Sequence, residues 1–225
     1  LVSLLSDDVH KSQNQTVTAE QLKKVELIQE NAAWAIGTAV KNIGEFAPWA
    51  LEEFAIDGIK TTPIDLLLFQ LKQNGSSKKR QRILYALGSM LRGNRIVQAH
   101  FCASGGPAVV GTILSSSSDD AKTAKRLLAL ADDVISDVTM HPYEVDDNID
   151  KLIISSFSTD DFCQAPIPLL TQEALQETAL ETIQALEPYC QWDKKKLKVS
   201  VSKVKKQRKG HDHIEELADS ILSEL

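Results

Sequence analysis

Residues 29–42 read QENAAWAIGTAVKN, a run in which small side chains surround a single tryptophan, Trp34. Alanine and glycine allow a helix to approach its neighbours closely, because interaxial distances depend on the side chains at the contact. We therefore expect a helix that is tightly packed on its small sides. The tryptophan then either fills space between helices or lies on a face of its own.

The pattern in this run occurs three times along the chain. Its copies read AWAIGTAV at residues 33–40, LYALGSML at 84–91 and LLALADDV at 127–134. The offsets between them are 51 and 43 residues, close to the ~40–47 residues of armadillo and HEAT units. This spacing predicts a helical repeat protein.

The segments between these copies also repeat. Two amphipathic stretches end in glycine, FAIDG at 54–58 and RIVQAHFCASGG at 95–106, and glycine is common at helix ends because it accepts positive φ. New helices follow at 62–72 and 107–114, each with a proline near its start. Each unit is thus a triplet of helices. The sequence predicts an all-α, right-handed armadillo/HEAT-like α-solenoid with helical capping segments.

The predicted organisation has three parts. Residues 1–21 form an N-terminal capping segment, 22–140 the armadillo-like repeats, and 141–225 a C-terminal helical repeat or cap. Within the last part, 173–190 and 213–225 have the apolar stripes of amphipathic helices.

A basic run at 194–209 separates those two helices and contains nine lysines and arginines in sixteen residues. We expect a solvated loop in preference to an RNA or membrane patch, because no aromatic residues interleave the charges as base stacking requires. The net charge of -6 argues against a general nucleic-acid binder. No apolar run approaches the ~18 residues that span a bilayer, so we expect no membrane insertion.

The repeat places aromatic and hydroxyl side chains at matching positions. Residues 34, 85 and 128 correspond, and so do residues 38, 89 and 132 one helical turn later. In armadillo proteins these helices line the concave groove, although the aromatic residues could instead fill space between repeats. The candidate partner-binding residues of this concave face are Glu30, Trp34, Thr38, Lys41, Tyr85, Ser89, Arg92 and Asp132.

No motif of the sequence indicates a catalytic centre. Residues 104–111, SGGPAVVG, lack the GK[ST] of a phosphate-binding loop, and there is no GxSxG serine elbow. His100 and His141 have no evident acidic or cysteine partner, and His211-Asp212-His213 would bind a metal only with a third ligand. We expect a protein that is not an enzyme and that has no cofactor and no metal.

The three cysteines form an odd set without a CxxC pair. Cys163 and Cys190 could form a disulfide, but we favour buried free thiols for them and for Cys102. N-glycosylation sequons occur at Asn14 and Asn74 in polar stretches, and they favour a lumenal or secreted setting over chance occurrence. Because the chain begins at leucine and not at methionine, removal or omission of a signal peptide is compatible with this expectation.

The runs QENAAWAIGTAVKN and LYALGSMLRGN, with the glycine-terminated helices between them, resemble the armadillo-type nucleotide exchange factors of heat shock protein 70 chaperones. The resemblance covers about residues 22–138. It implies that the concave face embraces lobe II of the chaperone's ATPase domain and shifts it relative to lobe I. The nucleotide cleft then opens, ADP leaves, and ATP rebinds.

The two sequons and the net negative charge of the chain make it most similar to the endoplasmic-reticulum member of that family, which acts on the lumenal chaperone BiP. This resemblance implies the endoplasmic reticulum lumen as the location, with a cytosolic paralogue as the alternative. Two other functions stay open: a generic armadillo scaffold or adaptor that reads extended peptides, and a helical enzyme with an unrecognised site.

The sequons generate a direct test of the compartment. When the protein is made in a secretory host, glycosidase treatment should lower its mass, because both acceptor asparagines lie in polar stretches where a glycan fits. The double variant Asn14→Gln/Asn74→Gln is the control and should show no change. An unchanged mass for the wild-type chain would remove the strongest sequence support for a lumenal setting.

Overall fold

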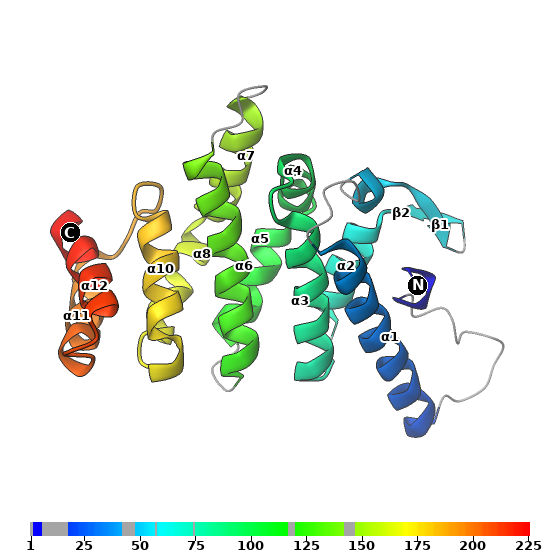
Figure 1. The fold of residues 1–225 in the computed structure, drawn as a ribbon, viewed down its shortest axis with the longest axis horizontal. Helices are drawn as coiled ribbons and strands as arrows, with labels where there is room; N and C mark the ends of the chain where they lie inside the picture. Colours follow the sequence, from blue (N-terminus) through cyan, green and yellow to red (C-terminus); the bar gives the residue numbers. More distant parts are fainter. Residues whose placement is uncertain are drawn as a thin grey trace. The chain divides into compact units, whose positions relative to one another are not determined.

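The chain folds almost entirely into helices (Figure 1). In the computed structural model, a single two-stranded hairpin is the only sheet among the described residues. The architecture is an all-α armadillo-like solenoid, which confirms the predicted fold class; its right-handed sense stays a prediction. The structure describes residues 2–5, 18–41, 48–56, 58–73, 75–116, 120–141 and 147–225.

The chain divides into two compact units, unit 1 (Leu1–Ser104) and unit 2 (Gly105–Leu225). The elements of unit 1 are η1 (Val2–Leu5), α1 (Ala19–Val40), η4 (Pro48–Leu51), β1 (Phe54–Ile56), β2 (Ile59–Thr61), α2 (Pro63–Lys72), α3 (Ser77–Leu91) and α4 (Arg95–Ala103). The elements of unit 2 are α5 (Gly106–Ser116), α6 (Ala121–Met140), α7 (Asp147–Phe157), α8 (Asp160–Gln164), α9 (Pro166–Leu169), η5 (Glu173–Leu175), α10 (Gln176–Leu186), α11 (Lys194–Gln207) and α12 (Asp212–Glu224).

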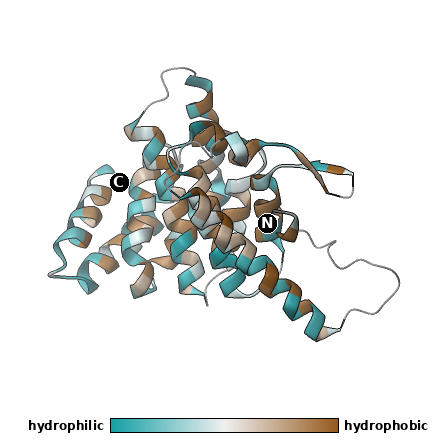
Figure 2. Ribbon diagram, turned by 45° about the vertical axis from the view of Figure 1, so that its right-hand side comes forward, coloured by the Kyte–Doolittle hydropathy of each residue, from teal (hydrophilic) through white to brown (hydrophobic). Residues whose placement is uncertain are grey.

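In each unit, a helix that carries the repeated pattern packs along another helix of the same unit. In unit 1, α1 lies along α3, and α2 packs against α3 and α4. In unit 2, α6 lies along α10, which also packs against α12. Apolar and polar residues alternate along individual helices (Figure 2), as expected for helices that each bury one face. None of the helices in the described segments is both long and apolar enough to cross a bilayer.

Polar side chains mark the starts of the predicted helices. Thr18 and Gln21 form a capping box at the start of α1. Thr62 caps α2, whose first residue is the proline seen in the sequence, and Ser76 caps α3. Each caps by accepting a backbone N–H that the helix itself leaves unpaired. The helices at 62–72 and 107–114 are therefore confirmed, with ends shifted by at most two residues.

The stretch at 54–58 is a strand and turn instead of the end of a helix. Phe54–Ile56 pairs antiparallel with Ile59–Thr61, and Gly58 lies in the turn between them at φ +80°. The glycine was expected to end a helix, yet its positive φ here serves a hairpin. Short runs that alternate in exposure suit strands better than a helix.

The basic run at 194–209 is also not the loop that was expected. It forms α11, capped by Asp193, with Leu197, Val201 and Val204 buried. Those three residues lie at i, i+4 and i+7, so one side of the helix packs while most of the lysines stay in solvent. The high charge of the run obscured this apolar spacing in the sequence.

Cys163 and Cys190 form a disulfide, so the expectation of free thiols was wrong for this pair. The bond joins α8 to the segment that follows α10, with a Cα–Cα distance of 5.8 Å. Closing a loop of 27 residues limits the unfolded chain and contributes about 3.5 kcal/mol of stability on a chain-entropy estimate. Cys102 is buried and is not part of this disulfide.

α1 and α3 approach each other closely at Gly37. A Cβ added there would lie 2.7 Å from Cδ1 of Tyr85 and 2.9 Å from Cα of Ala86. The glycine in the motif AWAIGTAV is therefore required by the approach of a neighbouring helix. Gly88, its counterpart in α3, has nothing within 4 Å of the same added atom.

Because of this difference, replacing glycine by alanine should have opposite effects on stability at positions 37 and 88. Gly37→Ala should lower the free energy of unfolding by about 1–3 kcal/mol, because the new methyl group meets the backbone of α3. Gly88→Ala should raise it by up to about 1 kcal/mol, because alanine favours the helix and meets no neighbour. Urea unfolding of both variants measures the two effects. A stabilised Gly37→Ala protein would contradict the close approach.

Candidate functional site

Trp34 is the most exposed aromatic of the repeated helices. It lies on α1 with 47% of its surface accessible, and the guanidinium of Arg82 on α3 lies 4.8 Å from the centre of its ring. This is a cation–π contact across the α1–α3 pair. The exposure does not suit a side chain that merely fills space between helices. Of the two placements of this tryptophan, the structure shows the one on an exposed face, and its role in binding a partner stays a prediction.

Tyr85 is placed differently from its counterpart Trp34. It is half-buried, and its ring edge lies against Gly37 of α1. Part of its ring is therefore packed between the two helices, and the rest is accessible to solvent. The hydroxyls one turn later, those of Thr38 and Ser89, donate to the backbone carbonyls of Trp34 and Tyr85 at 2.9 and 2.8 Å.

Glu30, a candidate partner-binding residue, is buried and links α1 to α3. Only 6% of its surface is accessible, and its carboxylate forms an ion pair with Lys78 of α3. One turn earlier, Glu26 accepts a hydrogen bond from the backbone N–H of Ser76, and this bond lowers the pKa of Glu26. Both glutamates fasten the start of α3 to α1, so Glu30 is not available as a free rim charge.

Lys41 and Arg92 occupy equivalent positions at the ends of α1 and α3. Both are exposed, and their backbone N–H groups donate to the carbonyls of Gly37 and Gly88. Cations at helix C-termini are favourable because they oppose the helix dipole. Lys78 and Arg82 of α3 add two further cations, of which Arg82 lies over the Trp34 ring and Lys78 is paired with Glu30. We call this surface, Trp34 with Lys41, Lys78, Arg82 and Arg92, the Trp34 face.

Lys78 and Arg82 were missed as site residues in the sequence. They belong to the run SKKRQR at residues 77–82, at the start of α3. The run is a recognisable basic signal, but its relation to Trp34 depends on the pairing of α1 with α3. The sequence shows only that the two segments are about 50 residues apart.

Unit 2 presents a different surface at the third copy of the repeat. Leu128, which aligns with Trp34 and Tyr85, is fully buried. The repeat predicted an open position there, but α10 packs against α6, and the hydroxyl of Thr182 on α10 lies 3.4 Å from the carbonyl of Leu128. The structure therefore does not continue the aromatic series into unit 2.

Asp132 is half-buried near other carboxylates. Its Oδ1 accepts a hydrogen bond from Ser136 at 3.3 Å. Burial, followed by the nearby charge of Glu181, raises the pKa of Asp132 above its ordinary value. This part of unit 2 is acidic, in contrast to the Trp34 face of unit 1.

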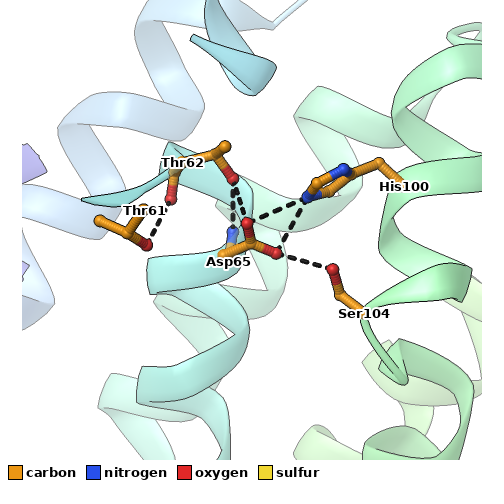
Figure 3. Close-up of polar contacts among 5 residues, drawn as sticks. All are labelled: Thr61, Thr62, Asp65, His100 and Ser104. Atoms are coloured by element: carbon orange, nitrogen blue, oxygen red, sulfur yellow. Dashed lines mark hydrogen bonds and ion pairs between the residues drawn. The ribbon is translucent and has the colours of Figure 1, made fainter. Parts of the chain in front are cut away.

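A polar cluster links α2 to α4 in unit 1 (Figure 3). The carboxylate of Asp65 accepts hydrogen bonds from Thr62 at 2.7 Å and from Ser104 at 2.8 Å. Both of its oxygens also lie 3.0 Å from Nε2 of His100. The expectation that His100 has no acidic partner was wrong, because Asp65 is 35 residues away along the chain.

The three residue types of this cluster also occur in hydrolytic triads, but their order differs here. The hydroxyl of Ser104 and the imidazole of His100 both point to the carboxylate of Asp65, as Figure 3 shows. A nucleophilic serine instead donates its proton to the histidine. The cluster is a clamp between the start of α2 and the end of α4.

The two sequon asparagines, Asn14 and Asn74, lie outside the described residues. Residues 14–220 match the protein family described as the SIL1/FES1/HPBP1 C-terminal domain. The matched range contains α1 to α11, the first nine of the 13 residues of α12, and every candidate partner-binding residue. Comparison with curated proteins found no match to the chain.

The Asp65 clamp predicts a dependence of stability on pH. Burial alone would raise the pKa of Asp65, but hydrogen bonds from its three neighbours hold it below the ordinary 3.8. A lowered pKa in the folded state stabilises the protein above pH ~4, and this stability is lost as pH falls through the folded pKa.

Asp65→Asn should therefore be less stable than wild type at pH 7, and the gap should shrink below pH ~4. Thermal unfolding between pH 7 and pH 2.5 measures the gap. Glu52→Gln, at an exposed carboxylate of the same unit, is the control and should show no such convergence. A constant gap for Asp65→Asn would show that the charge of this carboxylate does not hold the clamp.

Proposed function

Because the chain belongs to the SIL1/FES1/HPBP1 C-terminal domain family of nucleotide exchange factors for heat shock protein 70 chaperones, we propose that it acts on BiP in the lumen of the endoplasmic reticulum. In this proposal the chain binds lobe II of the chaperone's ATPase domain and promotes the release of ADP. The Trp34 face is the central contact.

The observation that carries the proposed contact is the exposed Trp34 with Arg82 against its ring. Tryptophan and arginine are the residues most often found at binding hot spots, where a large aromatic anchor is desolvated by the partner. The pair is held in place before binding, because α1 and α3 are packed together and Arg82 already contacts the ring. Little side-chain freedom is then lost when the complex forms.

Exchange by such a surface requires no chemical group of its own. A protein that binds the open form of the ATPase domain more tightly than the closed form shifts the chaperone towards the open form. Moving the equilibrium from 1:99 to 99:1 requires a preference of roughly 10⁴. Linkage then requires ADP to weaken exchange-factor binding by the same factor by which the exchange factor weakens ADP binding.

The basic residues of unit 1 and the acidic residues of unit 2 are consistent with a partner that carries charged patches on its surface. The Trp34 face of unit 1 carries four cations, one of which, Lys78, is paired with Glu30, whereas unit 2 carries Asp132 and Glu181 near one another. Complementary charges raise association rates and reject wrong partners more than they add affinity. We infer that lobe II offers an acidic patch to the Trp34 face.

The lumenal location is supported by the Cys163–Cys190 disulfide. Disulfides persist in oxidising compartments and are rare in the cytosol. The sequons at Asn14 and Asn74 point the same way, since glycosylation of such sites occurs on the secretory route. In the cytosol the disulfide would tend to be reduced and the sequons would not be glycosylated.

Trp34→Ala tests the central contact. It should weaken binding to the ADP-bound chaperone by about 2 kcal/mol, roughly thirtyfold, because an exposed aromatic anchor is lost. Nucleotide exchange should slow in proportion at subsaturating protein. Thermal stability should change little, since almost half of the side chain is already in solvent. Stopped-flow release of a fluorescent ADP analogue and calorimetric titration measure exchange and affinity.

Phe69→Ala is the matched control for this experiment. Phe69 is an aromatic residue of unit 1 with the same 47% accessibility as Trp34, but it lies on α2. It should keep full affinity and exchange activity. A Trp34→Ala protein with full affinity and activity would show that this face is not the contact. Equal activity of the wild-type chain on BiP and on cytosolic chaperones would contradict the choice of BiP.

A further inference from the structure

Two glutamates on α10 and a histidine on α12 bring their donor atoms together in unit 2. Glu177 and Glu181 lie one helical turn apart on α10, and His213 is the second residue of α12. Nε2 of His213 is 3.8 Å from Oε1 of Glu177 and 3.6 Å from Oε1 of Glu181. Ligand atoms from all three residues lie within 4.8 Å of one another.

These separations do not fit direct hydrogen bonds between the imidazole and the carboxylates. Protein N–H···O bonds measure about 2.7–3.2 Å, and both histidine contacts are longer. In a tetrahedral zinc site with bonds of about 2.0–2.2 Å, neighbouring ligand atoms are about 3.3–3.6 Å apart. The two histidine–carboxylate distances are therefore close to the separation of neighbouring ligands in a coordination shell, and the three donor atoms lie within 4.8 Å of one another.

The two helices are fixed relative to one another near this cluster. Ile214 and Leu217 of α12 are buried, and α12 packs directly on α10. Nε2 of Gln184 on α10 donates to the hydroxyl of Ser220 on α12 at 2.8 Å. The backbones of the three donors are thus already in place, so that rotation of exposed side chains suffices to close the site.

The surroundings of the cluster are negatively charged. Asp132 of α6 lies near enough to Glu181 for that glutamate to raise the pKa of Asp132, in addition to the larger effect of burial. Asp132 and Glu181 are therefore like charges held near one another on the packed pair α6 and α10. A bound cation would lower this repulsion.

We propose that Glu177, Glu181 and His213 form a binding site for a divalent transition-metal ion, with Zn²⁺ as the fitting ion. One imidazole nitrogen and two carboxylates suit zinc, whereas calcium and magnesium prefer six or more oxygen ligands. Water completes the fourth position. The sequence motif His211-Asp212-His213 lacked a third ligand, and α10 supplies two carboxylates to its second histidine.

Metal binding would join α12 to α10 at the start of the last helix. A ligand that binds only the folded state raises the free energy of unfolding by RT ln(1 + L/Kd), where L is the free ligand concentration. The inference does not depend on the proposed chaperone partner.

The test uses the complete chain with zinc alone as the probe. Calorimetric titration at pH 7.5 should show one Zn²⁺ per chain, and zinc should raise the melting temperature. His213→Ala and Glu181→Gln should each weaken zinc binding by roughly tenfold or more, which is about 1.4 kcal/mol or more. Both positions are accessible to solvent, so the variants should fold as the wild type does.

Two neighbouring substitutions are matched controls. His211→Ala removes the other histidine of the motif, and Glu216→Gln removes an exposed carboxylate of α12 outside the cluster. Both should bind zinc like the wild type. The proposal is overturned if the wild type shows no saturable zinc binding, or if His211→Ala weakens it as much as His213→Ala. Binding of Ca²⁺ as tight as that of Zn²⁺ would overturn the choice of a transition metal.

Discussion

At Gly37, α1 approaches α3 so closely that no side-chain atom fits between the glycine and the backbone of Ala86. This approach sets the spacing of the two helices in unit 1. It also sets the register of the contacts along them, in which Glu30 meets Lys78 and Trp34 meets Arg82. A steric contact of this kind has one best position, because packed interiors do not deform continuously.

A surface built in this way suits an exchange factor. The family acts on a chaperone, and such action needs an extended rigid face that prefers one conformation of the partner. On the Trp34 face, which we propose as the contact, the tryptophan is exposed and the pairing of α1 with α3 brings Arg82 to its ring. In this proposal the binding surface depends on the packing of the two helices.

Polar and covalent links join helices at several places in the chain. The Asp65 clamp joins α2 to α4, the Cys163–Cys190 disulfide joins α8 to the segment after α10, and the proposed metal site joins α10 to α12. Whole-domain stability is only about 5–15 kcal/mol, so a disulfide contribution of about 3.5 kcal/mol is a large share of it. Such links matter in a solenoid, where each helix contacts mainly its neighbours.

The sequence alone determined the fold class and most helices, because the spacing of small and apolar residues is a local property of the chain. It also identified Trp34, Lys41 and Arg92 as surface residues. It did not determine that Leu128 and Glu30 are buried, that His100 meets Asp65, or that Cys163 pairs with Cys190. The apolar spacing of α11 was present in the sequence but obscured by charge. The other features depend on which helices lie side by side, and residues 27 to about 50 positions apart become neighbours only when packing brings their helices together.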